Sequence, residues 1–219
     1  MMTMNRPYII INCAMSADGK IASPSGQQLK ISSEEDIKRM YNLRNSCDAV
    51  LVGVGTIIAD NPKLTVKENY VKNPKNPIRV ILDTHCRTKT NALAVDDQAK
   101  TLIFTNGECD KNYGSDVEVI QCDVDSEGTI DLIKMLEILH NRNIKKLLVE
   151  GGSTVIWNFL KQGLVDDLFV FIGPIIIGGK YTPSMADGEG IESGNPIKLE
   201  IVEIKKIEPG ILVQYKLVK

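Results

Sequence analysis

Apolar segments rich in β-branched residues alternate with helical segments along most of this chain. Several of the apolar segments are apolar throughout, which is typical of parallel strands that are covered on both faces. Strands are expected at 8–11, 50–54, 78–82, 101–104, 117–120 and 147–149. The C-terminal part predicts strands at 167–172, 199–204 and 211–217 without helices between them, the last two joined by a turn at 208–210. The pattern predicts an α/β fold in which helices flank a mainly parallel central sheet that ends in antiparallel C-terminal strands.

Three segments have the spacing of helices. The first begins after Ser32 or Ser33, either of which is a suitable cap, and capping explains the acidic residues at 34–36. The second covers 130–141, and its residues Ile130, Ile133, Leu136 and Ile138 are expected to face inward. The third covers 154–162 and ends before Gly163. Because no repeat, low-complexity tract or linker interrupts the pattern, a single domain over 1–219 is expected.

Composition narrows the class of protein. The chain is 43% hydrophobic and 25% charged, and its 26 basic residues nearly balance its 28 acidic ones. A nucleic-acid-binding protein typically has a basic excess or stripe, and this sequence has neither. The longest apolar runs are far shorter than the roughly 20 residues of a membrane-spanning helix. Residues 1–6 lead directly into a strand, which predicts that no secretory signal is present, so a cytoplasmic enzyme or binding domain is expected.

The five cysteines are odd in number and widely spaced, and no two of them form a Cys-x-x-Cys pair. Only His85 and His140 are available to join them, and no zinc-site pattern results. We therefore expect no disulfide, no metal site and no reactive thiol. Cys13 and Cys47 lie in or beside apolar segments and are expected to be small buried residues.

A first glycine turn, Gly53-Val54-Gly55-Thr56, comes directly after the strand at 49–52. Glycines in this place let backbone N–H groups approach a phosphate at the start of a helix. Position 58, where a Rossmann fingerprint has its third glycine, is Ile58. Taken alone, the motif is better explained as a tight strand-to-helix turn.

A second glycine turn, Glu150-Gly151-Gly152-Ser153-Thr154, also follows a strand and opens a helix. Its amides and two hydroxyls suit an anion, although Ser153 or Thr154 can equally be a plain cap. Because open α/β sheets bind ligands at the carboxyl ends of their strands, the two turns together indicate a nucleotide-type ligand. Glu150 either accepts hydrogen bonds from nearby amides or faces the cleft as an acid or ligand anchor.

Other polar turns have more than one interpretation. Asp83 ends a strand, where an acidic residue binds a ribose hydroxyl or caps its own turn. Turn chemistry alone explains the segments at 18–20 and 59–62. The glycine–lysine pairs at 19–20 and 179–180 are not followed by serine or threonine, so no Walker motif exists and phosphoryl transfer is excluded.

Five ordered motifs, which together cover essentially the whole chain, resemble the reductase of riboflavin biosynthesis. They are NCAMSADGKIA at 12–22, VGVGT at 52–56 with ADNPKLT at 59–65, PIRVILD at 77–83, VEGGS at 149–153, and GP at 173–174 with GG at 178–179. The similarity is to the stand-alone archaeal and fungal form and to the C-terminal half of the bacterial deaminase–reductase. It implies a dihydrofolate-reductase-like fold, NADPH as the cofactor and a homodimer. The His-x-Glu and Pro-Cys-x-x-Cys motifs of a zinc deaminase do not occur, so only the reduction is expected.

The resemblance also implies roles for individual residues. Glu150 is expected to bind substrate and steer protons as the main catalytic residue, with Asn12 assisting by hydrogen bonds. Substrate-binding positions match Gln28, Arg44, Leu64 and Lys67. Cofactor-binding positions match Ala14, Thr56, Asp60, Asp83, Thr84, His85, Arg87, Gly151, Gly152, Ser153 and Thr154. In this family the last four form the pyrophosphate loop, and the loop at 83–87 lies near the adenosine ribose and its 2′-phosphate.

Two positions depart from the bacterial enzymes. Asn12 stands where they have lysine, as it does in the archaeal form, so a lysine-dependent mechanism does not transfer. Lys67 stands where they have an arginine that contacts substrate phosphate, and lysine is a compact charge without bidentate geometry.

The implied reaction opens the ribosyl ring of 2,5-diamino-6-ribosylamino-4(3H)-pyrimidinone 5′-phosphate to an imine-like form and transfers hydride to C1′. Such a reaction asks the protein mainly for positioning and charge stabilisation. One alternative is a pterin reductase of the dihydrofolate-reductase type, which should have an acidic residue on its first helix that faces the pterin. The other is a non-catalytic nucleotide-binding module.

Overall fold

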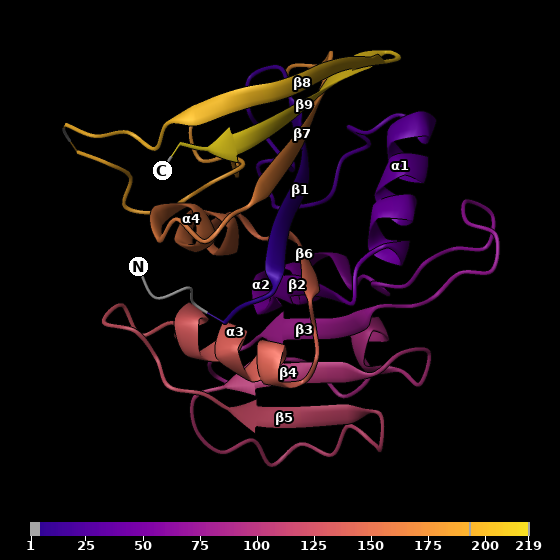
Figure 1. The fold of residues 1–219 in the computed structure, drawn as a ribbon, viewed down its shortest axis with the longest axis vertical. Coiled ribbons are helices and arrows are strands. Elements are labelled where there is room, and N and C mark those ends of the chain that lie inside the picture. The colour runs from indigo at the N-terminus through magenta and orange to yellow at the C-terminus, as the bar shows by residue number, and fades with distance from the viewer. Residues whose placement is uncertain (1–4, 193, 219) are drawn as a thin grey trace. The chain divides into compact units, whose positions relative to one another are not determined.

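The computed structural model describes residues 5–192 and 194–218 (Figure 1). Residues 1–4, on which the prediction about a secretory signal partly depends, lie outside this described part. The described residues divide into two compact units, one formed by 5–8 and 42–148, the other by 9–41, 149–192 and 194–218. A single domain over 1–219 stays a prediction.

Parallel strands form the centre of the first unit. β2 (Ala49–Gly53), β3 (Ile78–Leu82), β4 (Thr101–Thr105) and β5 (Val117–Gln121) lie in the order β5-β4-β3-β2, and each neighbouring pair is parallel. Every residue of β2 and β4 is buried, as expected for strands that are covered on both faces. All four strands lie within one residue of their predicted limits.

Among the described helices of the first unit, only α3 begins at a residue whose side chain caps it. α2 (Val54–Asp60) follows β2 directly and ends at Asn61, which is left-handed with φ 42°. A short 3-10 turn, η1, covers Leu93–Val95. α3 (Leu132–Asn141) begins after Asp131, whose carboxylate accepts hydrogen bonds from two N–H groups of the first turn.

The inward face of α3 differs from the prediction. Its buried residues are Leu132, Met135, Leu136 and Leu139, which follow the i, i+3, i+4, i+7 spacing of one helical face. The prediction that Ile133 and Ile138 face inward is wrong, since both are only half-buried. Ile130 is buried, but it precedes the helix.

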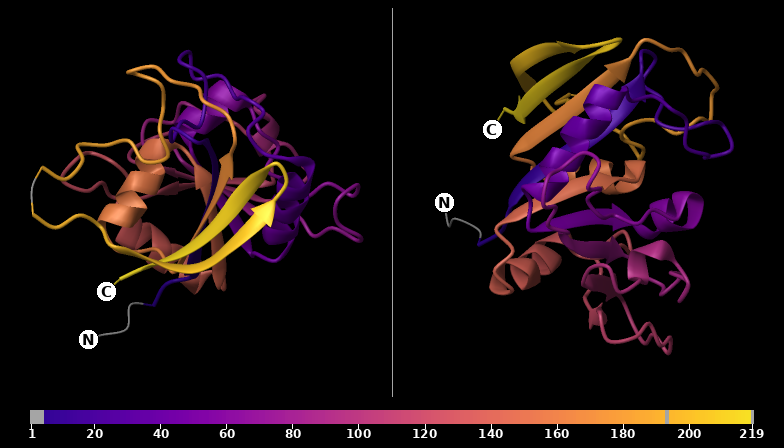
Figure 2. Two further views of the ribbon diagram at one scale, coloured as in Figure 1. Left: turned by 90° about the horizontal axis from the view of Figure 1, so that it is seen from above. Right: turned by 90° about the vertical axis from the view of Figure 1, so that its right-hand side faces the viewer.

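The sheet of the second unit mixes parallel and antiparallel pairs. β1 (Tyr8–Ser16), β7 (Asp167–Gly173), β9 (Gly210–Leu217) and β8 (Leu199–Ile207) lie in the order β1-β7-β9-β8. The β1–β7 pair is parallel, whereas β7–β9 and β8–β9 are antiparallel. β8 and β9 form the long yellow hairpin of Figures 1 and 2. These pairings confirm the predicted α/β class with mainly parallel strands and antiparallel C-terminal strands.

The remaining elements carry Arg44 and the second glycine turn. α4 (Ser153–Lys161) belongs to the second unit, while α1 (Glu34–Asn45) and β6 (Lys146–Gly151) run along the chain from one unit into the other. Ser33 caps α1, because its hydroxyl accepts a hydrogen bond from the N–H of Asp36 at 3.2 Å. In the residues that the structure describes, no helix combines the length and apolar character needed to cross a membrane.

The cysteines depart from the prediction in one respect. Cys86 and Cys109 form a disulfide, so the expectation that the chain has none is wrong. The two residues follow β3 and β4, which are parallel neighbours, and loops after such strands meet at the same edge of a sheet. A separation of 23 residues gives no sign of this proximity. Cys13 and Cys47 are buried free thiols, as predicted, and so is Cys122.

Candidate active site

The predicted site residues are divided between the two units. The second unit contains Asn12, Ala14, Gln28 and the turn at 150–154, and the first contains those from Arg44 to Arg87. Within 5–192 and 194–218, no group of three or more His, Cys, Asp or Glu side chains is placed to hold a metal ion.

In the second unit, Asn12 and Ala14 lie on β1. Asn12 is 8% exposed, and its amide oxygen accepts a hydrogen bond from Nη2 of Arg39 at 2.7 Å. Ala14 is half-buried and packs against a small apolar cluster that contains Phe171. Gln28 is exposed in the segment between β1 and α1. Of these three residues, only Asn12 lies in a polar environment inside the fold.

Sequence reasoning missed the partners of Asn12. Asp36 is 3% exposed, and its Oδ1 accepts a hydrogen bond from Nε of Arg39 at 2.8 Å. The guanidinium carbon of Arg39 lies 5.8 Å from the centroid of the Phe169 ring. The prediction that capping explains Asp36 is wrong, because Ser33 is the cap and Asp36 pairs with Arg39. A signal did exist: an asparagine in an apolar strand requires a buried partner, and Asp36 and Arg39 have helical i, i+3 spacing.

The thiol beside this cluster is inert. Burial raises the pKa of Cys13 to about 12, although the charge of Arg39 acts in the opposite direction. The thiol is therefore protonated at neutral pH, and thiolate is the reactive form.

The second glycine turn joins β6 to α4. Glu150 is half-buried at the end of a strand in which Leu147, Leu148 and Val149 are fully buried. Gly151 has φ 150°, a value that favours glycine. Gly152 occupies the N-cap position of α4, and no side chain caps the helix from that position. Ser153 and Thr154 lie inside the helix, so the alternative that one of them is the cap is wrong.

A loop of the second unit packs against α4. Nε1 of Trp157 donates a hydrogen bond to Glu189 at 3.0 Å, and Lys161 forms an ion pair with the same carboxylate. The hydrogen bond from Lys161 lowers the pKa of Glu189 to about 2, with help from Trp157. A Cβ at Gly188 would collide with the Trp157 ring. The N–H of Asp187 donates to the carbonyl oxygen of Ser153 at 3.4 Å, so this loop lies beside the first turn of α4.

In the first unit, Thr56 and Asp60 lie on α2, which begins within the first glycine turn. They are four residues apart, which places them on the same side of the helix. Thr56 is half-buried, and Asp60 is exposed at the helix end. Desolvation of the carboxylate nonetheless raises the pKa of Asp60 above its ordinary value.

Three predicted substrate residues lie in one region of the first unit. Nη1 of Arg44 donates a hydrogen bond to the carbonyl oxygen of Thr65 at 2.9 Å, which fixes Arg44 to the segment that carries the other two. Leu64 is 2% exposed with φ 55°, so its side chain belongs to the core. Lys67 is exposed.

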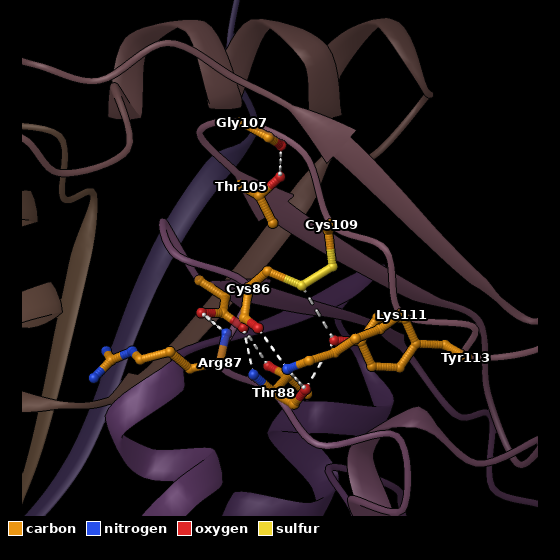
Figure 3. The surroundings of a disulfide bond; sticks show 9 residues. Cys86, Arg87, Thr88, Thr105, Gly107, Cys109, Lys111 and Tyr113 are labelled. Carbon is orange, nitrogen blue, oxygen red and sulfur yellow. Dashed lines mark hydrogen bonds between the residues drawn. A yellow bond between two sulfur atoms is a disulfide. The ribbon is translucent and has the colours of Figure 1, made fainter.

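The turn after β3 is organised by Asp83, which is fully buried. Its Oδ1 accepts a hydrogen bond from the N–H of Arg87 at 2.8 Å, and its Oδ2 accepts from the N–H and the hydroxyl of Thr88, both at 2.7 Å. Asp83 therefore caps its own turn, which is one of the two interpretations of the sequence. Thr84 is half-buried, and His85 and Arg87 are exposed. The Arg87 side chain points away from the disulfide (Figure 3).

The disulfide ties this turn to the segment after β4 (Figure 3). Nζ of Lys111 donates hydrogen bonds to the carbonyl oxygen of Cys86 at 2.5 Å and to the carbonyl oxygen of Thr88 at 2.8 Å. The Tyr113 hydroxyl donates to the same carbonyl oxygen of Thr88, also at 2.8 Å. Desolvation, assisted by the charge of Asp83, raises the pKa of Tyr113 to about 12, so the phenol remains a donor at neutral pH. The backbone of the turn is thus fixed from two sides.

Glycine turns follow β2 and β6, and each leads into a helix. These features place the protein in the general class of α/β proteins with strand-to-helix glycine turns. Comparison with known proteins is more specific. The model of the RibD C-terminal domain matches residues 7–213. The chain therefore belongs to the RibD C-terminal domain family, as the sequence motifs predicted.

Known proteins match this chain over nearly its full length. A protein of Archaeoglobus fulgidus, named 2,5-diamino-6-ribosylamino-4(3H)-pyrimidinone 5′-phosphate reductase, is 38% identical over 95% of this chain and 97% of its own length. The protein of the same name from Methanothermobacter thermautotrophicus is also 38% identical, over 96% of this chain and 98% of its own length. The predicted class of enzyme, an oxidoreductase of riboflavin biosynthesis, is confirmed.

Solved structures agree with the fold. A deaminase/reductase of Thermotoga maritima is 31% identical with a TM-score of 0.82, and the match covers 97% of this chain and 57% of that one. The riboflavin biosynthesis reductase Rib7 of Saccharomyces cerevisiae has a TM-score of 0.75 at 23% identity. The match covers 100% of this chain and 93% of that one. The predicted dihydrofolate-reductase-like fold is confirmed.

Proposed function

We propose that this chain catalyses the NADPH-dependent reduction of 2,5-diamino-6-ribosylamino-4(3H)-pyrimidinone 5′-phosphate to its ribitylamino product. The observation that carries the proposal is the 38% identity, over nearly the full length of both chains, to reductases of that name. In the reaction the ribosyl ring opens to an imine. The C1′ carbon accepts a hydride from NADPH, and the imine nitrogen accepts a proton.

The described residues suit NADPH. The first turn of α4 follows a glycine cap, so its backbone N–H groups are available to an anion such as pyrophosphate. His85 and Arg87 are exposed on a turn whose backbone is held by Asp83, and a guanidinium matches the geometry of a 2′-phosphate. Thr56 and Asp60 provide further polar groups on one side of α2.

The remaining roles are those that the family resemblance implies, and the chemistry and burial of the residues support them. We assign Glu150 to substrate binding and to steering the proton, since it is half-buried beside the proposed pyrophosphate turn. Asn12 assists by hydrogen bonding. Arg44 and Lys67 provide positive charge for the substrate phosphate, together with the polar side chain of Gln28.

Absorbance at 340 nm tests the proposal, because only the reduced nicotinamide absorbs there. We expect NADPH absorbance to fall when the ribosylamino substrate is supplied, and to stay constant without it or with dihydrofolate in its place. A fall with dihydrofolate alone would instead support a pterin reductase. Calorimetric binding of NADPH without turnover of either compound would support a binding module and contradict the proposal.

We further propose a homodimer, a single domain over 1–219 and a cytoplasmic location. Support for the homodimer comes from β8, which lies at the end of the strand order β1-β7-β9-β8. Its side chains Ile201, Val202 and Ile204 are 56%, 49% and 60% exposed. Apolar side chains gathered on an outer strand are typical of a surface that is covered in an assembly.

A further inference from the structure

The side chain of Asn12 is buried against a guanidinium. Asn12 is 8% exposed on β1, next to Ile11 and Cys13, which are also buried. Its Oδ1 accepts a hydrogen bond from Nη2 of Arg39 at 2.7 Å. Among the described residues the structure gives the amide nitrogen of Asn12 no acceptor. This nitrogen is not among the fully enclosed unpartnered atoms of the described residues, so it is open to a contact with a bound ligand.

Arg39 is itself held in place from two further directions. Its Nε and Nη2 lie 2.8 Å and 2.7 Å from Oδ1 of Asp36, a carboxylate that is almost completely buried. Its guanidinium carbon lies 5.8 Å from the centroid of the Phe169 ring, within the range of cation–π attraction. Phe169 is the register partner of Asn12 on β7, so the ring lies beside the residue that Arg39 contacts.

The chemistry of arginine then decides how the Asn12 amide is oriented. A guanidinium has five N–H donors and no acceptor, so the group that faces it must be the amide oxygen. The amide nitrogen of Asn12 consequently points away from Arg39. Turning the amide over would set N–H groups against N–H groups, and Nη2 of Arg39 would lose its hydrogen bond to Asn12 and keep only Asp36 as an acceptor.

We propose that Arg39 is a positioning residue that holds Asn12 as a hydrogen-bond donor toward an acceptor atom of the bound substrate. The inference rests on the proposed function, because it assigns Asn12 to that site. Asp36 neutralises Arg39 and fixes its plane. The substrate acceptor is an oxygen or nitrogen with a free lone pair, and an ammonium or a protonated amine would be rejected.

Asn12→Asp separates the donor role from a structural one. Aspartate has the same shape and adds a charge that attracts Arg39, so we expect the melting temperature to be unchanged or higher. It has no N–H to donate, so kcat should fall by roughly 10²-fold, the size found when one preorganised donor is removed. Wild-type kcat in this variant would overturn the proposal.

Arg39→Met tests the positioning. We expect kcat to fall at least about tenfold with little change in the substrate KM, whereas Lys38→Met, on the exposed neighbour in α1, should behave as wild type. Adding Asn12→Lys to Arg39→Met should restore most of kcat, because an ammonium donates in any orientation. The same Asn12→Lys change alone should be harmful, because it places two cations together. A kcat unaffected by Arg39→Met, or no rescue in the double variant, would contradict the inference.

A measurement without substrate keeps this inference separate from the proposed function. NMR signals of the Asn12 side-chain amide are assigned by their loss in Asn12→Asp. In the wild type we expect one narrow pair of N–H signals from this amide. In Arg39→Met the pair should be shifted or broadened by exchange. If Arg39→Met does not fold, Arg39→Lys takes its place. Identical amide signals in the wild type and the Arg39 variant would overturn the positioning role of Arg39, even if the wild type reduces the substrate. A wild type that shows the NMR effect but no turnover would overturn only the proposed function.

Discussion

Glu150 follows the buried residues 147–149 of β6 and immediately precedes the two glycines that lead into α4. If it binds substrate or steers a proton, Glu150→Gln should lower kcat/KM by roughly 10²-fold, a size typical of general acid–base catalysis. NADPH affinity should change little, because the amide keeps the shape of the side chain and the first turn of α4 is untouched.

The same preparation provides the control for this prediction. Melting temperature, the Kd for NADPH and kcat/KM are measured together on wild type and variant. A structural role for Glu150 predicts the opposite result, lost thermal stability with near-normal turnover in the folded fraction. Near-wild-type kcat/KM in a stable Gln variant would end the assignment of Glu150 as a catalytic residue.

Asp18 provides a pH-dependent prediction at the residue scale. Its carboxylate accepts hydrogen bonds from the Ser16 hydroxyl and from the N–H groups of Ile177 and Gly178. The bond from Ser16 contributes most to a pKa that is lowered to about 2. A carboxylate with a lowered pKa stabilises the fold fully above its ordinary pKa of about 3.9, and this stabilisation is lost as the pH falls through the folded-state value.

We therefore expect the wild type to melt above Asp18→Asn at pH 5 to 7, and this difference to shrink as the pH falls from about 4 toward 2. Circular dichroism melts across that range measure it. Asp97→Asn, a change of the same charge at another exposed position, is the matched control. A difference between wild type and Asp18→Asn that is independent of pH would show that the charge of Asp18 does not contribute.

Residues of the candidate site were predictable only where local backbone chemistry reveals them. Glycines after β2 and β6 mark the two turns, because a glycine sequence directly after an apolar strand is typical of a tight strand-to-helix connection. The Asn12–Arg39–Asp36 cluster joins positions 27 residues apart on different elements, so only the fold brings it together. Asp36 was misleading for a further reason: an acid in the first turn of a helix is normally explained by the helix dipole.

At the scale of elements, the turn after β3 holds Arg87 in a fixed backbone. If this turn binds the adenosine 2′-phosphate, Arg87→Ala should lower the NADPH/NADH ratio of kcat/KM by about tenfold or more, since one charge-assisted hydrogen bond contributes about 1.5–3 kcal/mol. The change should lie in the values for NADPH, with those for NADH nearly constant. Lys89→Ala, an exposed cation on the same loop, is the control, and an unaltered ratio in Arg87→Ala would remove Arg87 from the site.

The Cys86–Cys109 disulfide joins two loops of the first unit across 23 residues. In the chain-entropy model, closing a loop of this size stabilises the folded state by roughly 3 kcal/mol. We therefore expect dithiothreitol to lower the melting temperature of the wild type by several degrees. The double variant Cys86→Ser with Cys109→Ser should melt at the lower temperature with or without the reductant. Equal melting temperatures of wild type and double variant without reductant would show that the bond does not form in solution.

Most elements of the fold were predictable, because their signals are local. The parallel strands are rich in apolar residues, and the caps Ser33 and Gly152 lie within one or two positions of the expected helix starts. Ile133 and Ile138 were assigned wrongly to the inward face of α3 because each stands next to a buried leucine, so that hydrophobicity alone does not select one face. The disulfide depends on the adjacency of β3 and β4, which is a property of strand order and not of any segment.

At the scale of the whole molecule, the proposed homodimer is tested at the β8–β9 hairpin, whose outer strand exposes apolar side chains. Ile201 and Ile204 of β8 are 56% and 60% exposed, between charged residues that would keep an isolated strand in solution. Burial of such side chains stabilises an interface by about 25 cal/mol per Å² of apolar surface. If the proposed homodimer uses this hairpin, a lysine at both positions would have to be buried with its charge unpaired.

We therefore expect wild type to elute with twice the 24.2 kDa mass of the chain in size-exclusion chromatography with light scattering. Ile201→Lys with Ile204→Lys should shift the mass to that of the monomer at micromolar concentration. Ile58→Lys on α2, at a position that is 55% exposed, places a single lysine at an exposed apolar position of the first unit and should leave the dimer intact. A double variant that remains dimeric would exclude the hairpin as the interface, and a monomeric wild type would exclude the homodimer itself.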